Sequence, residues 1–177
     1  MFKKNNFEIT RCRPQKIWSL DQVKNYLRVS HTYDDDLIKS LTETAINVAE
    51  NFTSLCLLSR EITFVSNLEE EKFALKYSPI RKLVSVSLGK ANLSFALAND
   101  QYYMDFERSS LYLQRPISNN ELTVKYIAGF KASAIPCSIK QGILLHVCEM
   151  YDREGESTSI LSNESKNLYL PYKKIRV

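Results

Sequence analysis

The stretch SHTYDDDLIKSLTETAINVAENFTSLCL, residues 30–57, carries the strongest helical pattern in the chain. Its apolar side chains recur at steps of three and four residues, which places them on one face of a helix. These side chains are Leu37, Ile38, Leu41, Ala45, Val48, Ala49 and Phe52. The spacing predicts a long amphipathic helix over residues 33–52.

Three consecutive aspartates, residues 34–36, fall in the first turn of this predicted helix, with His31 just before them. The helix macrodipole favours carboxylates there, and Thr32 could act as the N-cap with Asp35 reaching back. Consecutive helical residues point about 100° apart, so the three side chains cannot converge on one ion. The alternating ligands and the glycine turn of a calcium loop are also missing. The pattern therefore favours a helix start over a metal site.

Composition places the chain among ordinary globular proteins, with 177 residues, 44% hydrophobic residues and 25% charged residues. This length suits one domain, or one domain with an insertion, and needs no disulfide or metal to fold. The net charge of +4 permits contact with nucleic acid or an acidic partner but argues for neither. No apolar run has the length of a membrane span, and the basic N-terminus lacks the apolar core of a signal peptide. We therefore expect no membrane partner and no export.

Helical spacing elsewhere predicts helices over residues 20–27, where Ser19 can cap, and over residues 138–153. Gly142 inside the last helix costs about 1 kcal/mol relative to alanine, which indicates close packing at that position. Between these helices, residues 60–129 consist of short runs of β-branched and aromatic residues separated by turn residues. Such runs predict six or seven antiparallel strands.

The order of these elements predicts an α+β fold in which helices from both ends of the chain pack together around an inserted antiparallel β meander. Residues 1–17 are polar and basic, and we expect a flexible N-terminal arm. Residues 18–156 would form the domain itself. Residues 157–177 would form an extended C-terminal tail, which is basic at its end.

Motifs of enzymes and metal sites are missing from the sequence. The four glycines are too far apart for a phosphate-binding or dinucleotide-binding loop, and no G-x-S-x-G elbow occurs. No C-x-x-C pair occurs, which favours reduced, mostly buried thiols. His146 and Glu149 make at best a weak metal pair, and His146 fits better as a residue at the edge of the core. Stretch YYMDF sets aromatics beside an acid, so we expect strand packing and not base stacking. We predict no catalysis, no metal and no cofactor.

The first half of the chain resembles the opening of the tailed-phage head–tail connector (adaptor) family. The matching stretch is SLDQVKNYLRVSHTYDDDLIKSLTETAINVAENFT, and its matching positions are Leu20, Val23, Lys24, Leu27, Arg28, residues 34–38, Ala49, Glu50 and Thr53. The stretch ELTVKYIAGFKASAIPCSIKQGILLHVCEMYDREGE and the final LYLPYKKIRV are similar to the second half of that family. Phe130 stands where tyrosine is commoner, and Gly142 where alanine is commoner. The resemblance does not cover residues 1–17 or the details of the β insertion.

This resemblance implies a structural virion protein of a phage, prophage or gene transfer agent, assembled in the bacterial cytoplasm. Family members form a homo-oligomeric ring, a dodecamer in the particle, that docks on the portal protein and joins the DNA-filled head to the tail. A stopper or tail-completion protein would bind the other side, and DNA would pass without sequence-specific contact.

In the family, the C-terminal segment reaches the portal. Its apolar and aromatic residues suit strand addition or groove docking, and its basic residues suit an acidic rim on the partner. The docking residues implied here are Leu168, Tyr169, Leu170, Pro171, Tyr172, Lys173, Lys174, Ile175 and Arg176.

Two other functions remain open from the sequence. One is a different tail-completion or assembly protein, which would lack portal affinity. The other is a small enzyme or nucleic-acid-binding module, for which a bound metal or a steep salt dependence of DNA affinity would be the sign.

Overall fold

The computed structural model describes residues 5–12, 16–67, 69–90, 93–116, 120–152 and 161–174. The chain divides into two compact units, which are described separately below. A helical unit comprises Gln15–Leu57 and Lys131–Val177, and a β unit comprises Met1–Pro14 and Leu58–Phe130. Helices from both ends of the chain therefore share one unit, and the strands between them form the other. The predicted α+β class is confirmed.

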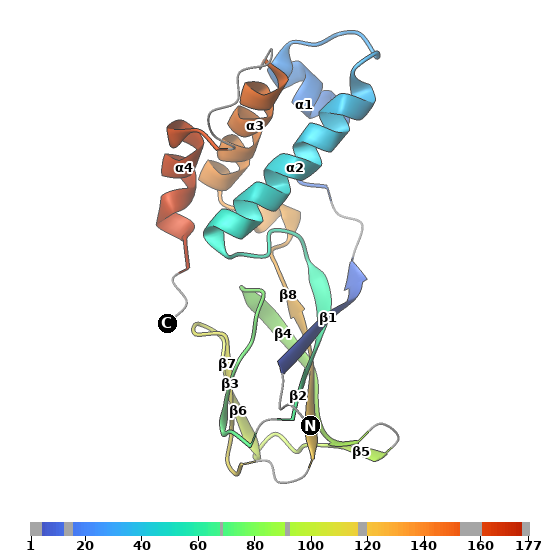
Figure 1. Ribbon diagram of the computed structural model, residues 1–177, viewed down its shortest axis with the longest axis vertical. Helices are drawn as coiled ribbons and strands as arrows, with labels where there is room; N and C mark the ends of the chain where they lie inside the picture. Colours follow the sequence, from blue (N-terminus) through green and yellow to red (C-terminus); the bar gives the residue numbers. More distant parts are fainter. Residues whose placement is uncertain are drawn as a thin grey trace. The chain divides into compact units, whose positions relative to one another are not determined.

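Four α-helices build the helical unit (Figure 1). Helix α2 packs along α3, α1 contacts both of them, and α4 contacts α3 and α2. Short 3-10 helices lie at Ala132–Ala134 and Leu170–Tyr172. The bounds are α1 Leu20–Leu27, α2 Asp35–Thr53, α3 Cys137–Tyr151 and α4 Asn163–Tyr169. The three helices expected from periodicity are present within two residues at each end.

Helix α1 begins with a capping box, as the position of Ser19 suggested. The Ser19 hydroxyl accepts a hydrogen bond from the Gln22 backbone N–H, and the Gln22 side chain accepts one from the Ser19 N–H. Helix α2 begins differently from the prediction. Its N-cap is Asp34 and not Thr32. The Thr32 carbonyl oxygen accepts a hydrogen bond from the Asp35 N–H at 3.2 Å.

The core of the helical unit consists of apolar faces from both ends of the chain. Its fully or almost fully buried side chains include Val23, Ile38, Ala45, Ala49, Ile139, Ile143, Val147 and Tyr169. Leu37 was expected in this stripe but is 51% exposed. Ile38 takes the inward position, and Leu37 lies about 100° away around the helix. Within the described residues, no helix is both long enough and apolar enough to cross a membrane.

The β unit contains two antiparallel sheets, with strand orders β1-β2-β8-β4-β5 and β3-β7-β6. The strands are antiparallel as predicted, but their order departs from a simple meander because β8 lies between β2 and β4. The bounds are β1 Asn5–Cys12, β2 Arg60–Ser66, β3 Lys72–Ala74, β4 Ile80–Lys90, β5 Leu93–Ala96, β6 Tyr102–Asp105, β7 Ser110–Leu113 and β8 Glu121–Ala128.

Strand β1 corrects the expectation of a flexible N-terminal arm. Asn5–Cys12 pairs with β2 at the edge of the larger sheet, and the Phe7 ring lies 4.7 Å from that of Phe64, its partner in register. The alternation of Phe7 and Ile9 with polar residues is a strand pattern, and it outweighs the basic character of the segment. Residues 1–4 and 13–15 of the predicted arm lie outside the described residues.

A buried face organises the larger sheet. Ile62, Phe64, Leu122, Val124 and Tyr126 are fully buried, and the Tyr126 hydroxyl donates to the Lys76 carbonyl oxygen at 2.5 Å. After β8, Gly129 has φ +96°, and a Cβ there would lie 2.3 Å from the Leu58 carbonyl oxygen. Only glycine tolerates both conditions.

The C-terminal segment also differs from the prediction of an extended tail. Helix α4 and the following 3-10 turn fold onto the helical unit, because Tyr169 supplies a large side chain that is completely buried there. Residues 153–160 and 175–177 of the predicted helix end and tail lie outside the described residues.

Candidate docking surfaces

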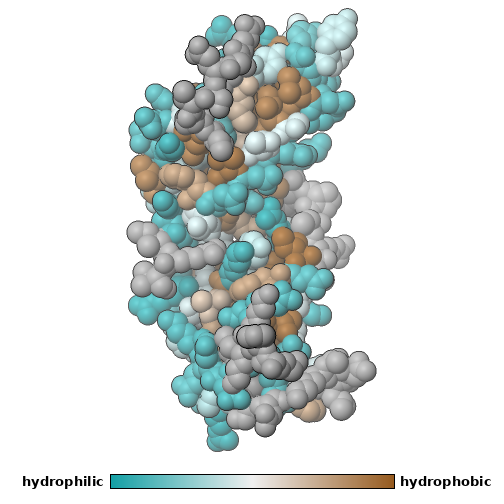
Figure 2. Space-filling view, in the orientation of Figure 1, coloured by the Kyte–Doolittle hydropathy of each residue, from teal (hydrophilic) through white to brown (hydrophobic). Residues whose placement is uncertain are grey.

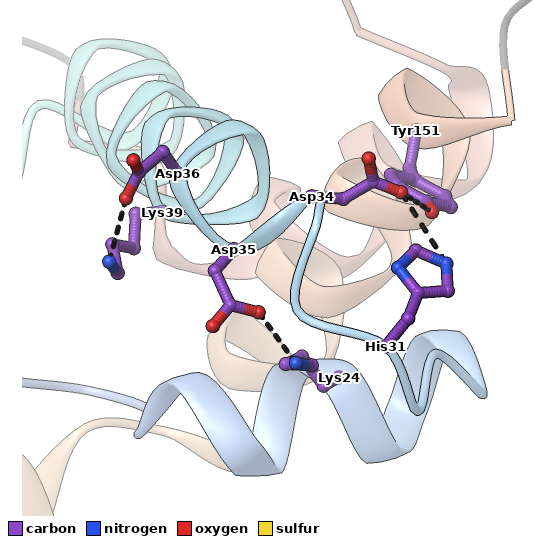
Figure 3. A network of polar contacts seen from close by, with 7 residues as sticks. All are labelled: Lys24, His31, Asp34, Asp35, Asp36, Lys39 and Tyr151. Carbon is purple, nitrogen blue, oxygen red and sulfur yellow. Dashed lines mark hydrogen bonds and ion pairs between the residues drawn. The ribbon is translucent and has the colours of Figure 1, made fainter.

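The three aspartates at the start of α2 have no partner in common (Figure 3). Asp34 accepts a hydrogen bond from the Tyr151 hydroxyl at 2.6 Å and lies 3.7 Å from the His31 ring nitrogen. Asp35 pairs with Lys24 of α1, and Asp36 pairs with Lys39 one turn along α2. The carboxylates therefore diverge, and the prediction of a helix start is confirmed.

Each of these contacts has a different physical weight. The Asp35–Lys24 pair joins atoms 2.5 Å apart on side chains that are 27% and 11% exposed, so it links α2 to α1 in a partly dry setting. The Asp36–Lys39 pair is exposed; its hydrogen bond lowers the pKa of Asp36 and raises that of Lys39, although water screens the pair. The hydrogen bond to Asp34 raises the pKa of Tyr151 and ties the start of α2 to the end of α3.

His146 is completely buried, so the expectation that it lies at the edge of the core is wrong. It shares helix α3 with Glu149, but no group of three or more His, Cys, Asp and Glu side chains is arranged to hold a metal within the described ranges. Among the described cysteines, Cys56 is buried, Cys148 half-buried and Cys137 exposed, and none of the three is in a disulfide. Burial raises the pKa of the Cys148 thiol.

The C-terminal segment contains the residues that the sequence assigned to docking. Leu168 and Tyr172 are half-buried, Leu170 is 52% exposed, and Pro171 is exposed. The Lys173 ammonium lies 5.1 Å from the centre of the Phe52 ring, and the Lys174 backbone N–H donates to the Thr53 carbonyl oxygen at 2.9 Å. Ile175 and Arg176 lie outside the described residues. The segment is thus attached to the C-terminal end of α2 as far as Lys174.

Tyr169 attaches this segment to the helical core. Its ring lies against Gly142 of α3, where an added Cβ would be 2.5 Å from the nearest ring carbon. The centres of the Tyr169 and Phe52 rings are 6.1 Å apart. Burial, and secondly the charge of Glu149, raise the pKa of Tyr169. Its hydroxyl has no hydrogen-bond partner among the described residues. The close packing indicated by Gly142 in the sequence is present, with Tyr169 as the neighbour.

Exposed large apolar residues occur in both units among the described residues. On the face drawn in Figure 2, small apolar areas lie between hydrophilic ones. In the helical unit the exposed large apolar residues include Tyr33, 92% exposed, together with Leu37 and Leu170. Tyr33 and Leu37 lie at the start of α2, whereas Leu170 directly follows α4.

A cross-strand row on the smaller sheet of the β unit was not anticipated from the sequence. Tyr112 of β7 is the register partner of both Lys72 and Tyr103, so the three side chains share one face. The Lys72 ammonium is 5.7 Å from the Tyr112 ring, and the two tyrosine rings are 6.2 Å apart. Tyr103 is 66% exposed. Alternation within each strand indicates which of its side chains share a face. Which residues of different strands lie side by side depends on the register between the strands, which the sequence does not show.

No family model matches this chain, and no curated protein sequence does. Solved structures do. A chain from the neck of an empty gene transfer agent particle, computed with C6 symmetry, matches over 97% of both chains with a TM-score of 0.78 and 17% identity. The chain has the fold of a gene transfer agent neck protein.

Two further structures agree with that match. A chain from the neck of a native gene transfer agent particle, computed with C12 symmetry, matches over 97% of both chains with a TM-score of 0.76 and 17% identity. A chain from the virion of a native gene transfer agent particle matches over 97% of this chain and 96% of its own length, with a TM-score of 0.76 and 16% identity. The three matches agree on the fold, which this chain shares with chains from the neck and the virion of gene transfer agent particles.

Proposed function

We propose that this chain is a structural component of the neck of a phage-like particle: a head–tail connector that joins the DNA-filled head to the tail. The observation that carries the proposal is the shared neck-protein fold, which extends over 97% of the chain and includes both the helices and the inserted strands. The order of the sequence motifs supports it independently, because fold similarity alone does not specify function. The protein would be located in the virion and assembled in the bacterial cytoplasm.

A ring of identical subunits is part of this proposal. Two of the matching neck structures were computed with C6 and C12 symmetry, which supports assembly around an axis. We assign the chain a homo-oligomeric ring, a dodecamer in the particle. Its partners would be the portal protein on one side and a stopper or tail-completion protein on the other. DNA would pass through without sequence recognition, and the proposal assigns the chain no catalytic step and no cofactor.

The C-terminal segment is the proposed contact with the portal, and we divide its nine predicted residues into two groups. Leu168 and Tyr169 hold the segment on the helical unit, since Tyr169 is completely buried. Residues 170–176 would make the contact, and Leu170 and Pro171 already present apolar surface. This division changes the experiment that tests the contact. Deleting the chain from Leu168 onward would uncover the surface around Gly142 and would confuse docking with folding.

The test therefore removes residues 173–177 only, which leaves Tyr169 in place. We expect this shortened chain to remain folded, with a small loss of stability from the missing contacts of Lys173 and Lys174 with α2. It should lose binding to the portal ring encoded in the same genome, measured by co-sedimentation. Leu170→Asp should weaken binding as well, because it places a charge on exposed apolar surface. Phe95→Asp is the matched control, since Phe95 is 65% exposed in the β unit. Undiminished portal binding by both the shortened chain and the Leu170→Asp chain would refute C-terminal docking.

Microscopy of the full-length protein mixed with the portal ring tests the connector function itself. An added ring of density on the portal is the expected result. Absence of association at both low and moderate salt would refute the portal partnership, whatever the behaviour of the C-terminal variants.

A further inference from the structure

An open pocket of about 500 Å³ lies where the start of α2 meets the end of α3. It is lined by Asp34, Leu37, Tyr151 and Asp152. The hydrogen bond from Tyr151 to Asp34 holds the two helix ends together beside it (Figure 3). The pocket lies wholly inside the helical unit, and the proposed portal contact does not use it.

The lining of this pocket has a specific chemistry. Two carboxylates, those of Asp34 and Asp152, stand next to apolar surface, because Leu37 is 51% exposed and the neighbouring Tyr33 is 92% exposed. An exposed aliphatic side chain beside acids is suited to a segment that carries cations on either side of an aliphatic residue. The carboxylates would pair with the cations, and Leu37 would contact the aliphatic residue.

The chain itself contains such a segment. Residues 173–176 read KKIR, so Ile175 stands between two lysines and Arg176. Lys173 is exposed. Three cations thus face two carboxylates in a contact between the segment and the pocket, and the signs are complementary.

The segment cannot reach the pocket of its own subunit. The Lys174 backbone N–H is bonded to the Thr53 carbonyl oxygen, at the last residue of α2, whereas Asp34 is the N-cap of the same helix. At 1.5 Å per residue, these two ends of α2 are about 28 Å apart. Ile175 and Arg176 extend at most about 7 Å beyond Lys174. Only the segment of another copy of the chain can enter the pocket.

We propose that the pocket formed by Asp34, Leu37, Tyr151 and Asp152 binds residues 173–176 of a second copy of this chain. The two partners of this contact differ, and the described residues of the segment, Lys173 and Lys174, lie at the end of α2 opposite to the pocket. The contact is therefore heterologous and can propagate from copy to copy. Because portal docking would use the same segment, the contact belongs to chains that have not met the portal. It therefore goes beyond the proposed function and can be tested with this chain alone.

The test is a charge reversal on each side, read by sedimentation velocity over a range of protein concentrations. Wild-type protein should self-associate, and more weakly at high salt, because ions screen exposed charges. Asp152→Lys and Arg176→Glu should each weaken association by at least about tenfold, or 1.4 kcal/mol. Asp36→Lys and Lys131→Glu are the matched controls: they make the same charge changes at exposed positions outside the pocket and should leave association unchanged.

Complementation then distinguishes a direct contact from a general effect of charge. An equimolar mixture of the Asp152→Lys and Arg176→Glu chains contains one reversed pocket and one reversed segment that complement each other, and it should associate more strongly than either chain alone. Equal association of wild type and both reversed variants, or a mixture no stronger than its components, would overturn the proposal. So would wild-type protein that stays monomeric throughout. A portal-bound ring formed under any of these outcomes would leave the connector function standing.

Discussion

Substitution of Gly142 by alanine tests how the C-terminal segment is held on the helical unit. A new Cβ would lie 2.5, 3.0 and 3.2 Å from three atoms of the Tyr169 ring. The first distance is shorter than Cβ contacts in proteins, and the other two are tighter than most of them. The ring is completely buried and cannot move aside into water. Overpacking of this kind costs about 1–3 kcal/mol. Against this, alanine gains about 1 kcal/mol over glycine in a helix interior.

The two effects can be separated by removing the ring. In wild-type protein Gly142→Ala should lower the free energy of unfolding by about 0–2 kcal/mol, the difference between the packing cost and the helix gain. In the Tyr169→Ala background the packing cost vanishes, and the same substitution should stabilise by about 1 kcal/mol. Tyr169→Ala alone should cost about 3–5 kcal/mol, as other large aromatic truncations do. The expected coupling between positions 142 and 169 is therefore about 1–3 kcal/mol.

Urea unfolding followed by tryptophan fluorescence measures these free energies of unfolding in the helical unit. Trp18 is the only tryptophan in the chain and belongs to the helical unit. Ser40→Ala, at an exposed position of α2, is the matched control and should have the same effect in both backgrounds. A Gly142→Ala effect that is equal with and without the Tyr169 ring would refute the packing argument.

Three further outcomes are expected. Stopping the chain after Asn167 should lower the free energy of unfolding by about 3–5 kcal/mol relative to stopping after Tyr172, because only the shorter chain loses the buried Tyr169 ring; equal urea midpoints would contradict this. The raised pKa of Tyr169 means that the folded state holds the phenolic proton more tightly than the unfolded state. The contribution of Tyr169 to the free energy of unfolding is therefore complete below about pH 10 and declines by about 1.4 kcal/mol per pH unit above it. Tyr169→Phe should flatten that alkaline decline in pH-dependent urea titrations, and an unchanged slope would speak against it. Asp35→Ala should destabilise by about 1–3 kcal/mol because it leaves Lys24 partly buried without its partner, whereas Asp36→Ala should change the melting temperature little because its pair is exposed; equal losses would show that burial does not separate the two pairs.

Local sequence patterns predicted most of the secondary structure. Apolar spacing placed α1, α2 and α3, because a helix exposes its periodicity in the order of its residues. The strands of residues 60–129 followed from alternation and from the turns between them. The aspartates could be assigned to a helix start because the angle between consecutive helical side chains forbids their convergence. Gly142 indicated a close approach without identifying the neighbour.

Contacts between distant residues decided the rest. In the larger sheet, β8 lies between β2 and β4. In the smaller sheet, strand pairing brings Lys72, Tyr112 and Tyr103 side by side. Both arrangements depend on the register between segments that no local sequence pattern links. Basic composition suggested a flexible arm where Phe7 and its neighbours pair with β2.

Both candidate docking surfaces depend on tertiary packing for the same reason. The KKIR segment and the aspartate at residue 34 are visible in the sequence. Their separation is not: Tyr169 packing on Gly142 and Lys174 bonding to Thr53 place the first two residues of the segment, Lys173 and Lys174, at the end of α2 opposite to Asp34. The sequence alone determined which residues form helices and which charges the chain carries. Only the tertiary structure decided which of them meet, because burial of a side chain depends on its neighbours in space and not on those along the chain.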